Sequence, residues 1–278
     1  MAGYLRLARP LNCGMSAVGV GIAAVVAVGW AGVQAIPWTI LLAAGAAALF
    51  TAGGNALNDY FDRDTDAVNH PDRPIPRGEM SADEALRFAA LTFALSLALA
   101  SLVGLLAVGI VVVNFVVMVA YEKTLKARGA GGNLLIAYLV GSLFVFGGAA
   151  AYRGDLAALD RTLVLGLLAA LATAGREVAK DIEDLAGDVD RVTLPRRIGV
   201  RGAGAVAAAA FGAGVVLSIV PYVLQILGTV YLGVVLVADI IFIWSGAYSA
   251  RNPGRAQRAA KYGMVVALAA FLLGGLLA

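Results

Sequence analysis

Nine long runs of apolar, charge-poor residues dominate this chain of 278 residues. Runs of roughly 17 to 25 such residues have the length of helices that cross a hydrocarbon core about 30 Å thick. Hydrophobic residues make up 61% of the chain, charged residues 14%, and the mean hydropathy is +0.86, outside the range of soluble globular domains. The sequence therefore predicts an all-α, polytopic membrane protein with transmembrane helices at residues 11–32, 36–57, 84–104, 106–121, 133–152, 159–179, 202–220, 222–247 and 259–277.

The basic residues indicate how these helices are oriented, because Lys and Arg accumulate in the cytoplasmic loops of membrane proteins. With nine helices, Arg153 and Arg161 lie on one side of the membrane. The other side holds Arg6, Arg9, Arg63, Arg73, Arg77, Lys123, Lys126, Arg128, Arg191, Arg196, Arg197, Arg251, Arg255 and Arg258. The N-terminus is therefore expected in the cytoplasm and the C-terminus outside the cell.

Two alternatives would change the number of helices. The boundary between the third and fourth helices depends on Gly104 and on the length of the run, so the apolar pattern also allows eight helices. Eight helices, however, would scatter the loop cations over both faces of the membrane. The first run could also be a signal peptide, but its apolar part exceeds the usual signal core of about 7 to 15 residues. Nine helices are therefore favoured.

The overall charge and the single cysteine exclude other classes of protein. The net charge is only +3, which gives no indication of a nucleic-acid partner. Cys13 is the one cysteine in the sequence, so the chain has no internal disulfide and no cysteine-based metal site.

The acidic residues gather in two segments that share a pattern. The matching aspartates are Asp59, Asp62 and Asp66 in NDYFDRDTD (residues 58–66), and Asp181, Asp184 and Asp188 in KDIEDLAGD (residues 180–188). Offsets of three and seven residues place three carboxylates on one helical face in each segment, and Asn58 joins the first face. Each segment continues the cytoplasmic end of a predicted membrane helix. This recurrence suggests an internal duplication within a single domain spanning residues 1–278.

Carboxylates one helical turn apart repel each other, and desolvation near a membrane adds to that cost, so both faces need cations. Ligands that offer only oxygen favour Mg²⁺ or Mn²⁺, and Mg²⁺ usually takes part of its coordination from substrate phosphates. The two faces are therefore interpreted as a clamp on a diphosphate. Solvated surface charges are the simpler alternative. A calcium loop is disfavoured because DRDTDAVNHPDR has neither Gly at its sixth position nor Glu at its twelfth.

Basic side chains follow both acidic segments and are candidates for binding phosphate. Prolines after Asp66 end the helix and form a stiff loop, which is expected to bring Arg73 and Arg77 back over the first acidic face. Further candidates are Lys126 and Arg128 after the fourth helix, Lys180 in the second segment, and Arg9 in RLARPLN before the first helix. For any one of these cations, membrane anchoring is the alternative role.

Two other polar residues are candidates for the substrate cavity. Asn12 enters the first helix, and Asp239 lies inside the eighth, where an unpaired carboxylate is costly. For Asp239 a packing role stays open beside a role in the site.

The sequence resembles the UbiA superfamily of intramembrane prenyltransferases. The similarity lies in NALNDYFDRDTDAVNHPDRPIPRG and REVAKDIEDLAGD, and also in RLARPLN, YEKTLK, GNLLIAYLVGSLFVFGG and LPRRIG. The resemblance implies nine helices around a central cavity, with a cytoplasmic cap and a lateral route to the lipid. It implies two Mg²⁺ ions, held by Asn58, Asp62 and Asp66 and by Asp181, Asp184 and Asp188. The diphosphate would bind Arg73, Lys126 and Lys180, with Arg9, Arg77 and Arg128 as further candidates.

Within the superfamily the fifth helix, the compact length and the second acidic segment are most similar to the archaeal digeranylgeranylglyceryl phosphate synthases. This branch implies a geranylgeranyl diphosphate donor and the free hydroxyl of geranylgeranylglyceryl phosphate as acceptor. Loss of the diphosphate would leave an allylic carbocation in an apolar cavity that excludes water. Asp66 or Tyr121 could then accept the proton of the hydroxyl, and Tyr121 could equally be an aromatic anchor at the membrane interface.

Two other functions compete with this interpretation. One is an aromatic prenyltransferase of quinone biosynthesis, similar to 4-hydroxybenzoate polyprenyltransferase, whose acceptor needs no phosphate pocket. The other is a cation transporter that uses the acidic helices for selectivity. Transport predicts ionisable groups at membrane depth on several helices, whereas Asp239 is the clear candidate of that kind in this sequence.

Overall fold

The computed structural model describes residues 2–125, 130–186 and 192–277. Every regular element in these ranges is a helix. The elements are α1 (Ala2–Ala8), α2 (Pro10–Ala35), α3 (Pro37–Asn69), α4 (Ala82–Val103), α5 (Leu105–Ala120), the π-helical turn η1 (Tyr121–Leu125), α6 (Ala130–Ala151), α7 (Ala157–Glu183), the 3₁₀ turn η2 (Asp184–Ala186), α8 (Leu194–Leu217), α9 (Val220–Val223), α10 (Thr229–Tyr248) and α11 (Pro253–Leu276).

The prediction of nine membrane-spanning helices is confirmed for the described part of the chain, where nine helices are long and apolar enough to cross a bilayer. The break between α4 and α5 falls at Gly104, as predicted. Gly104 has φ 151° and ψ 171°, a conformation that glycine adopts far more readily than other residues. The eight-helix alternative is therefore wrong.

Some helix boundaries differ from the prediction. The eighth membrane helix, α10, begins at Thr229 rather than at residue 222. Pro221 lies in the short helix α9, and Gln225 takes a positive φ of 54°, so the chain turns between α9 and α10. The seventh helix, α8, begins earlier than predicted, at Leu194, and bends at Gly199, which has φ 76°. Apolar length alone did not reveal these turns.

Local capping explains where two of the helices begin. At α4, Ser81 Oγ accepts a hydrogen bond from the Glu84 N–H, and the Glu84 carboxylate accepts one from the Ser81 N–H, which makes a capping box. At α11, the Asn252 side chain accepts from the Arg255 N–H. Such caps let a helix extend beyond its apolar run into the polar edge of the bundle.

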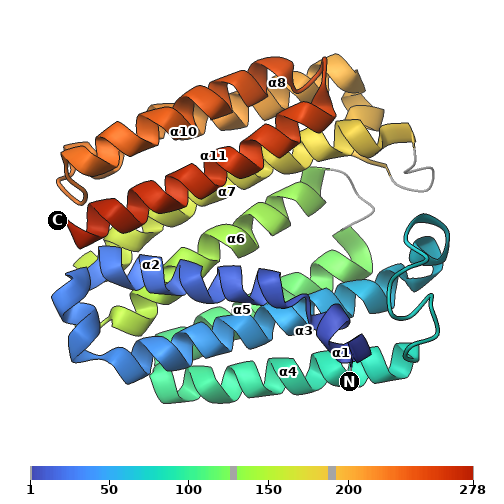
Figure 1. Ribbon diagram of the computed structural model, residues 1–278, viewed down its shortest axis with the longest axis horizontal. Helices are drawn as coiled ribbons and strands as arrows, with labels where there is room; N and C mark the ends of the chain where they lie inside the picture. Colours follow the sequence, from blue (N-terminus) through green and yellow to red (C-terminus); the bar gives the residue numbers. More distant parts are fainter. Residues whose placement is uncertain (1, 126–129, 187–191, 278) are drawn as a thin grey trace.

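The helices are arranged around α6, which lies between the first four membrane helices and the last four (Figure 1) and contacts α2, α3, α5 and α7. The contact between α6 and α7 is close because glycines face each other. A Cβ atom on Gly141 would lie 2.6 Å from the carbonyl oxygen of Gly166. Small residues at such positions let helix backbones approach within a membrane.

The two acidic segments lie at the same end of the bundle. The ends of α3 and α7 lie at this end together with α1, and the chain's C-terminus lies at the opposite end (Figure 1). Arg153 and Arg161 belong to the opposite end, where Arg161 donates to the Ala27 carbonyl at 3.1 Å, two residues before a bend of α2 at Gly29. Among the described residues, the predicted segregation of charge is therefore a segregation between the two ends of the bundle. The cytoplasmic cap and the side on which each terminus lies stay predictions.

Candidate active site

The first acidic segment forms the last turns of α3. Asp59 and Asp66 are both buried, with 3% of each residue exposed, whereas Asn58 and Asp62 are half-buried and line the large cavity described below. The predicted acidic helix is therefore present, but its carboxylates have two different environments.

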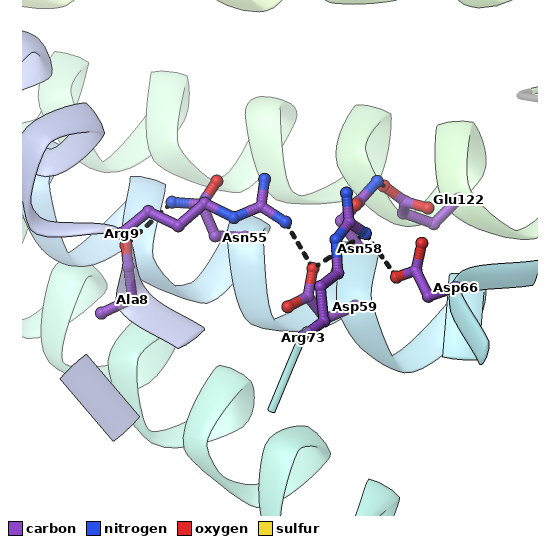
Figure 2. Close-up of polar contacts among 8 residues, drawn as sticks. All are labelled: Ala8, Arg9, Asn55, Asn58, Asp59, Asp66, Arg73 and Glu122. Carbon is purple, nitrogen blue, oxygen red and sulfur yellow. Dashed lines mark hydrogen bonds and ion pairs between the residues drawn. The ribbon is translucent and has the colours of Figure 1, made fainter. Parts of the chain in front are cut away.

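Two arginines neutralise the buried carboxylates (Figure 2). Arg73 Nη1 donates to Asp66 Oδ2 and lies 3.4 Å from Asp59 Oδ1, and Arg9 Nη2 donates to the same Asp59 oxygen. The loop after α3 thus brings Arg73 over the acidic face. It places Arg77 elsewhere, with its Nε 3.4 Å from Glu79 Oε1. Asp59, Arg9 and Arg73 also line a smaller cavity of about 330 Å³ with Arg6, Asp72 and Pro74.

Arg9 occupies a strained position between α1 and α2. Its φ of 53° and ψ of 73° are left-handed, a conformation that costs a non-glycine residue of order 1 kcal/mol or more. The preceding carbonyl, that of Ala8, accepts a hydrogen bond from Asn55 Nδ2 at 2.9 Å, which ties this junction to α3 (Figure 2). The strained backbone directs the guanidinium toward Asp59.

A buried glutamate was not among the residues predicted for the site. Glu122, in the turn η1, is 6% exposed and lines the large cavity with its neighbour Tyr121. Its Oε1 accepts a hydrogen bond of 3.0 Å from Asn58 Nδ2 (Figure 2). The sequence feature that could have indicated Glu122 is its place in YEKTLK, where a carboxylate directly follows an apolar helix.

The second acidic segment is divided between the end of α7 and the turn η2. Asp184 and Lys180 line the large cavity, whereas Asp181 is outside its lining and accepts a hydrogen bond of 2.8 Å from Asn133 Nδ2 on α6. Glu183 accepts from Gln257 Nε2 at 3.0 Å and lies 3.4 Å from Arg258 Nη1, which joins α7 to α11. Three predicted site residues, Lys126, Arg128 and Asp188, lie outside the described residues.

One cavity of about 1380 Å³ connects both acidic segments with the interior of the bundle. Of the predicted site residues, its walls include Arg9, Asn12, Asn58, Asp62, Asp66, Arg73, Tyr121, Lys180, Asp184 and Asp239. Arg77 and Asp181 are not among its lining residues. Away from the acidic end the lining is mostly apolar, with Leu143, Phe144, Leu168, Phe242 and Phe271 among it. The cavity therefore joins a charged mouth to an apolar interior.

Asp239 lies on the cavity wall within α10 and is 6% exposed. Ser218 Oγ lies 2.7 Å from Asp239 Oδ2 and donates to it, and Tyr231 donates its hydroxyl proton to the Ser218 carbonyl at 2.6 Å. Such a network offsets the cost of a carboxylate at membrane depth. The network is compatible with both roles considered above for Asp239, packing and substrate contact.

Two cations of the cavity wall add to those in the predicted site. Arg176 lies one turn before Lys180 on α7, and Lys261 lies on α11. Because Gln257 contacts Glu183 and the two helices run antiparallel, Lys261 lies about level with Lys180. Arg176 belongs to the second similar segment, but Lys261 belongs to no motif, and only the packing of α11 against α7 brings it to the site.

The donor atoms at the mouth fit Mg²⁺ chemically. Asn58, Asp62, Asp66 and Asp184 supply oxygen from two walls of one cavity, and oxygen ligands are those that Mg²⁺ prefers. Among the described residues, no group of three or more His, Cys, Asp or Glu side chains converges as a ready metal centre.

Comparison with known proteins identifies the family. The sequence profile of the UbiA prenyltransferase family matches residues 18–273. The digeranylgeranylglyceryl phosphate synthase of Haloquadratum walsbyi is 44% identical over 224 residues, which cover 80% of this chain and 77% of the relative. The enzyme of the same name from Methanopyrus kandleri is 40% identical over 281 residues, which cover 98% of both chains.

Solved structures share the fold. A structure described as that of digeranylgeranylglyceryl phosphate synthase in membranes has a TM-score of 0.84 and 30% identity, and the match covers 100% of this chain and 99% of that one. A UbiA homologue from Archaeoglobus fulgidus, bound to GPP and Mg²⁺, has a TM-score of 0.58 and 17% identity over 95% of this chain and 99% of the other. The multi-pass membrane fold, the two acidic segments at one end of a common cavity and these matches agree, and the chain belongs to the UbiA family of prenyltransferases.

Proposed function

We propose that this chain transfers a geranylgeranyl group from geranylgeranyl diphosphate to the free hydroxyl of geranylgeranylglyceryl phosphate, in a Mg²⁺-dependent reaction. The product carries the second ether bond of an archaeal membrane lipid. The observation that carries this proposal is the single cavity with a charged mouth and an apolar interior. A prenyl diphosphate has the same division between a charged head and an apolar tail, and the names of the curated relatives supply the acceptor.

The donor's diphosphate is proposed to bind at the mouth. Asn58, Asp62 and Asp66 on one wall and Asp184 on the other would hold the metal ions, and Asp181 and Asp188 are proposed as further ligands. When bound, Mg²⁺ neutralises negative charge on the departing diphosphate. Arg73 and Lys180 supply positive charge from the same two walls, and Arg9, Arg77, Lys126 and Arg128 are proposed as further contacts.

The chemistry of transfer requires a dry cavity and a proton acceptor. The bond between C1 of the prenyl group and the diphosphate oxygen breaks, and its electron pair leaves with the diphosphate. The apolar walls keep water from the allylic cation until the acceptor hydroxyl attacks C1. Asp66 and Tyr121 both line the cavity and are the proposed proton acceptors. Tyr121→Phe separates them, because it removes one acceptor and leaves the ring in place.

The acceptor's phosphate distinguishes this reaction from prenylation of an aromatic ring. Arg176 and Lys261 lie on the wall formed by α7 and α11, in addition to the cations assigned to the diphosphate, and Arg176 also pairs with Glu177. We assign to them the phosphate of geranylgeranylglyceryl phosphate. An aromatic acceptor has no phosphate for these two cations to bind.

The test uses purified protein, radiolabelled geranylgeranyl diphosphate and either geranylgeranylglyceryl phosphate or 4-hydroxybenzoate, with Mg²⁺ or with EDTA. We expect a labelled lipid product with the phosphate-bearing acceptor in Mg²⁺ and none in EDTA. Product formed with the aromatic acid alone would contradict the proposed acceptor and would favour the aromatic prenyltransferase.

A further inference from the structure

The hydrogen bond between Asn58 and Glu122 joins two residues 64 positions apart in the chain. Asn58 lies on α3 and Glu122 in the turn η1 after α5. Both line the large cavity, and the contact of 3.0 Å runs from Asn58 Nδ2 to Glu122 Oε1. Figure 2 shows the carboxylate of Glu122 facing the nitrogen of the Asn58 amide. A carboxylate on a residue that is only 6% exposed is costly without hydrogen-bond donors, and the Asn58 amide is one donor to it.

The chemistry of the pair fixes which way the amide points. The oxygen and nitrogen of a primary amide are similar in size, so hydrogen bonds decide their positions. An ionised carboxylate only accepts hydrogen bonds, whereas the amide nitrogen only donates them. The nitrogen of Asn58 therefore faces Glu122, and its oxygen faces away from that carboxylate. On the cavity side, Asp62 presents its own oxygens one turn further along the same helix.

We infer that Glu122 is a positioning residue that holds the Asn58 oxygen ready for the metal ion of the diphosphate site. This inference rests on the proposed function. A neutral amide can bind Mg²⁺ only through its oxygen, and an amide free to rotate would present its nitrogen part of the time. Groups that orient metal ligands in this way typically change metal affinity about 10- to 100-fold when they are removed.

The experiment measures two quantities for each variant. The first is the Mg²⁺ concentration that gives half-maximal binding of radiolabelled geranylgeranyl diphosphate, and the second is the melting temperature in EDTA. The variants are Glu122→Gln, Asn58→Asp and the double exchange N58D/E122Q. Asp64→Asn is the control, because Asp64 is a carboxylate on the same helix as Asn58, has 90% of its side chain exposed and does not line the cavity.

For Glu122→Gln we expect the half-maximal Mg²⁺ concentration to rise by up to about 10-fold, the lower end of the range for a lost orienting group, because the new amide can pair with Asn58 in either orientation. The melting temperature in EDTA should change little, because two amides can still pair. Asn58→Asp sets one carboxylate against another and should lower both the melting temperature and donor binding. The double exchange restores the pair with its roles reversed, since the new amide at position 122 donates to the new carboxylate at position 58. It should therefore recover both the Mg²⁺ requirement and the melting temperature. The control should match the wild type.

A second comparison separates positioning from direct metal binding by Glu122. If Glu122 acts through Asn58, then Glu122→Gln should add little to Asn58→Ala, whereas effects of two independent ligands would add. Additive losses of Mg²⁺ affinity would overturn the inference. A Glu122→Gln variant with an unchanged Mg²⁺ requirement would also overturn it, and donor binding by the wild type in that case would leave the proposed function uncontradicted. If the wild type binds no donor at any Mg²⁺ concentration, both the proposed function and the inference fail.

Discussion

At the residue scale, Arg73 stabilises two buried carboxylates, Asp59 and Asp66, by contacting both. Arg73→Ala should leave Asp66 without its arginine partner and Asp59 with Arg9. Removing one partner of a buried ion pair costs about 3 to 5 kcal/mol. The loss of folding stability in Arg73→Ala should fall near the lower end of this range, since 24% of the Arg73 side chain is exposed. Thermal unfolding in detergent measures it.

The control is Arg77→Ala, from the same loop. Arg77 is 52% exposed and pairs with Glu79, an arrangement worth less than about 1 kcal/mol. Adding Asp66→Asn to Arg73→Ala should restore part of the stability, because it removes the uncompensated charge. Equal melting temperatures for Arg73→Ala and Arg77→Ala would contradict the structural role given to Arg73.

Lys261 provides a second prediction at this scale. Lys261→Gln should raise the KM for geranylgeranylglyceryl phosphate about 10-fold, the order expected when one charge-assisted contact to phosphate is lost. The KM for the donor should stay close to the wild-type value. Arg255→Gln, on an exposed part of the same helix outside the cavity, is the control for loss of positive charge. A rise in the donor KM alone would place Lys261 at the diphosphate instead.

Spacing along one helix made part of the site predictable. The acidic face of α3 and the returning Arg73 follow from offsets of three, four and seven residues and from the prolines after the helix. Glu122 and Lys261 could not be found in this way. Each reaches the site through packing between helices that are distant in sequence; Lys261 belongs to no motif, and Glu122 in YEKTLK is a single carboxylate without a repeated spacing.

At the scale of the elements, the close approach of α6 and α7 connects the fold to the site, since α7 carries the second acidic segment. Gly141→Ala should destabilise the protein by about 1 to 3 kcal/mol, because its Cβ would lie 2.6 Å from the Gly166 carbonyl oxygen and would force the helices apart. Gly109→Ala on α5 has open space around the new Cβ, and the higher helix propensity of alanine should make it neutral or stabilising. Melting temperatures of the two variants in one detergent check this, and equal values would contradict the close packing.

Helix number was predictable because apolar length is set by the bilayer, and Gly104 marked the break between α4 and α5. Helix starts were less predictable. The start of α10 at Thr229 depends on the turn around Pro221 and Gln225, which lies inside a mostly apolar stretch without charges. In such a stretch hydropathy locates a turn poorly, because most turn residues are as apolar as the flanking helices.

At the scale of the whole molecule, the loop cations predict that the end bearing both acidic segments faces the cytoplasm. The test places single cysteines at Val68 and Leu277, which are 81% and 67% exposed, in a Cys13→Ser background. A membrane-impermeant maleimide should label Leu277→Cys in intact cells and Val68→Cys only after lysis. The reverse pattern would contradict the proposed orientation.

The convergence of both acidic segments on one cavity is a property of the whole fold. Sequence similarity between the segments suggested that they act together, but no local pattern places the end of α3 opposite the end of α7. That arrangement depends on all the helices packed around α6. The internal duplication behind it stays a prediction.

The most direct test of the central claim, that both acidic segments serve one Mg²⁺-dependent transfer, compares Asp62→Asn, Asp184→Asn and Asp64→Asn. Asp64 is the control, because it lies two residues from Asp62 with 90% of its side chain exposed and does not line the cavity. The measurement is the initial rate of labelled lipid formation in saturating Mg²⁺ by folded, purified protein. We expect rates lower by about 100-fold or more for Asp62→Asn and Asp184→Asn, and a wild-type rate for Asp64→Asn. Wild-type rates in either cavity variant would contradict the account.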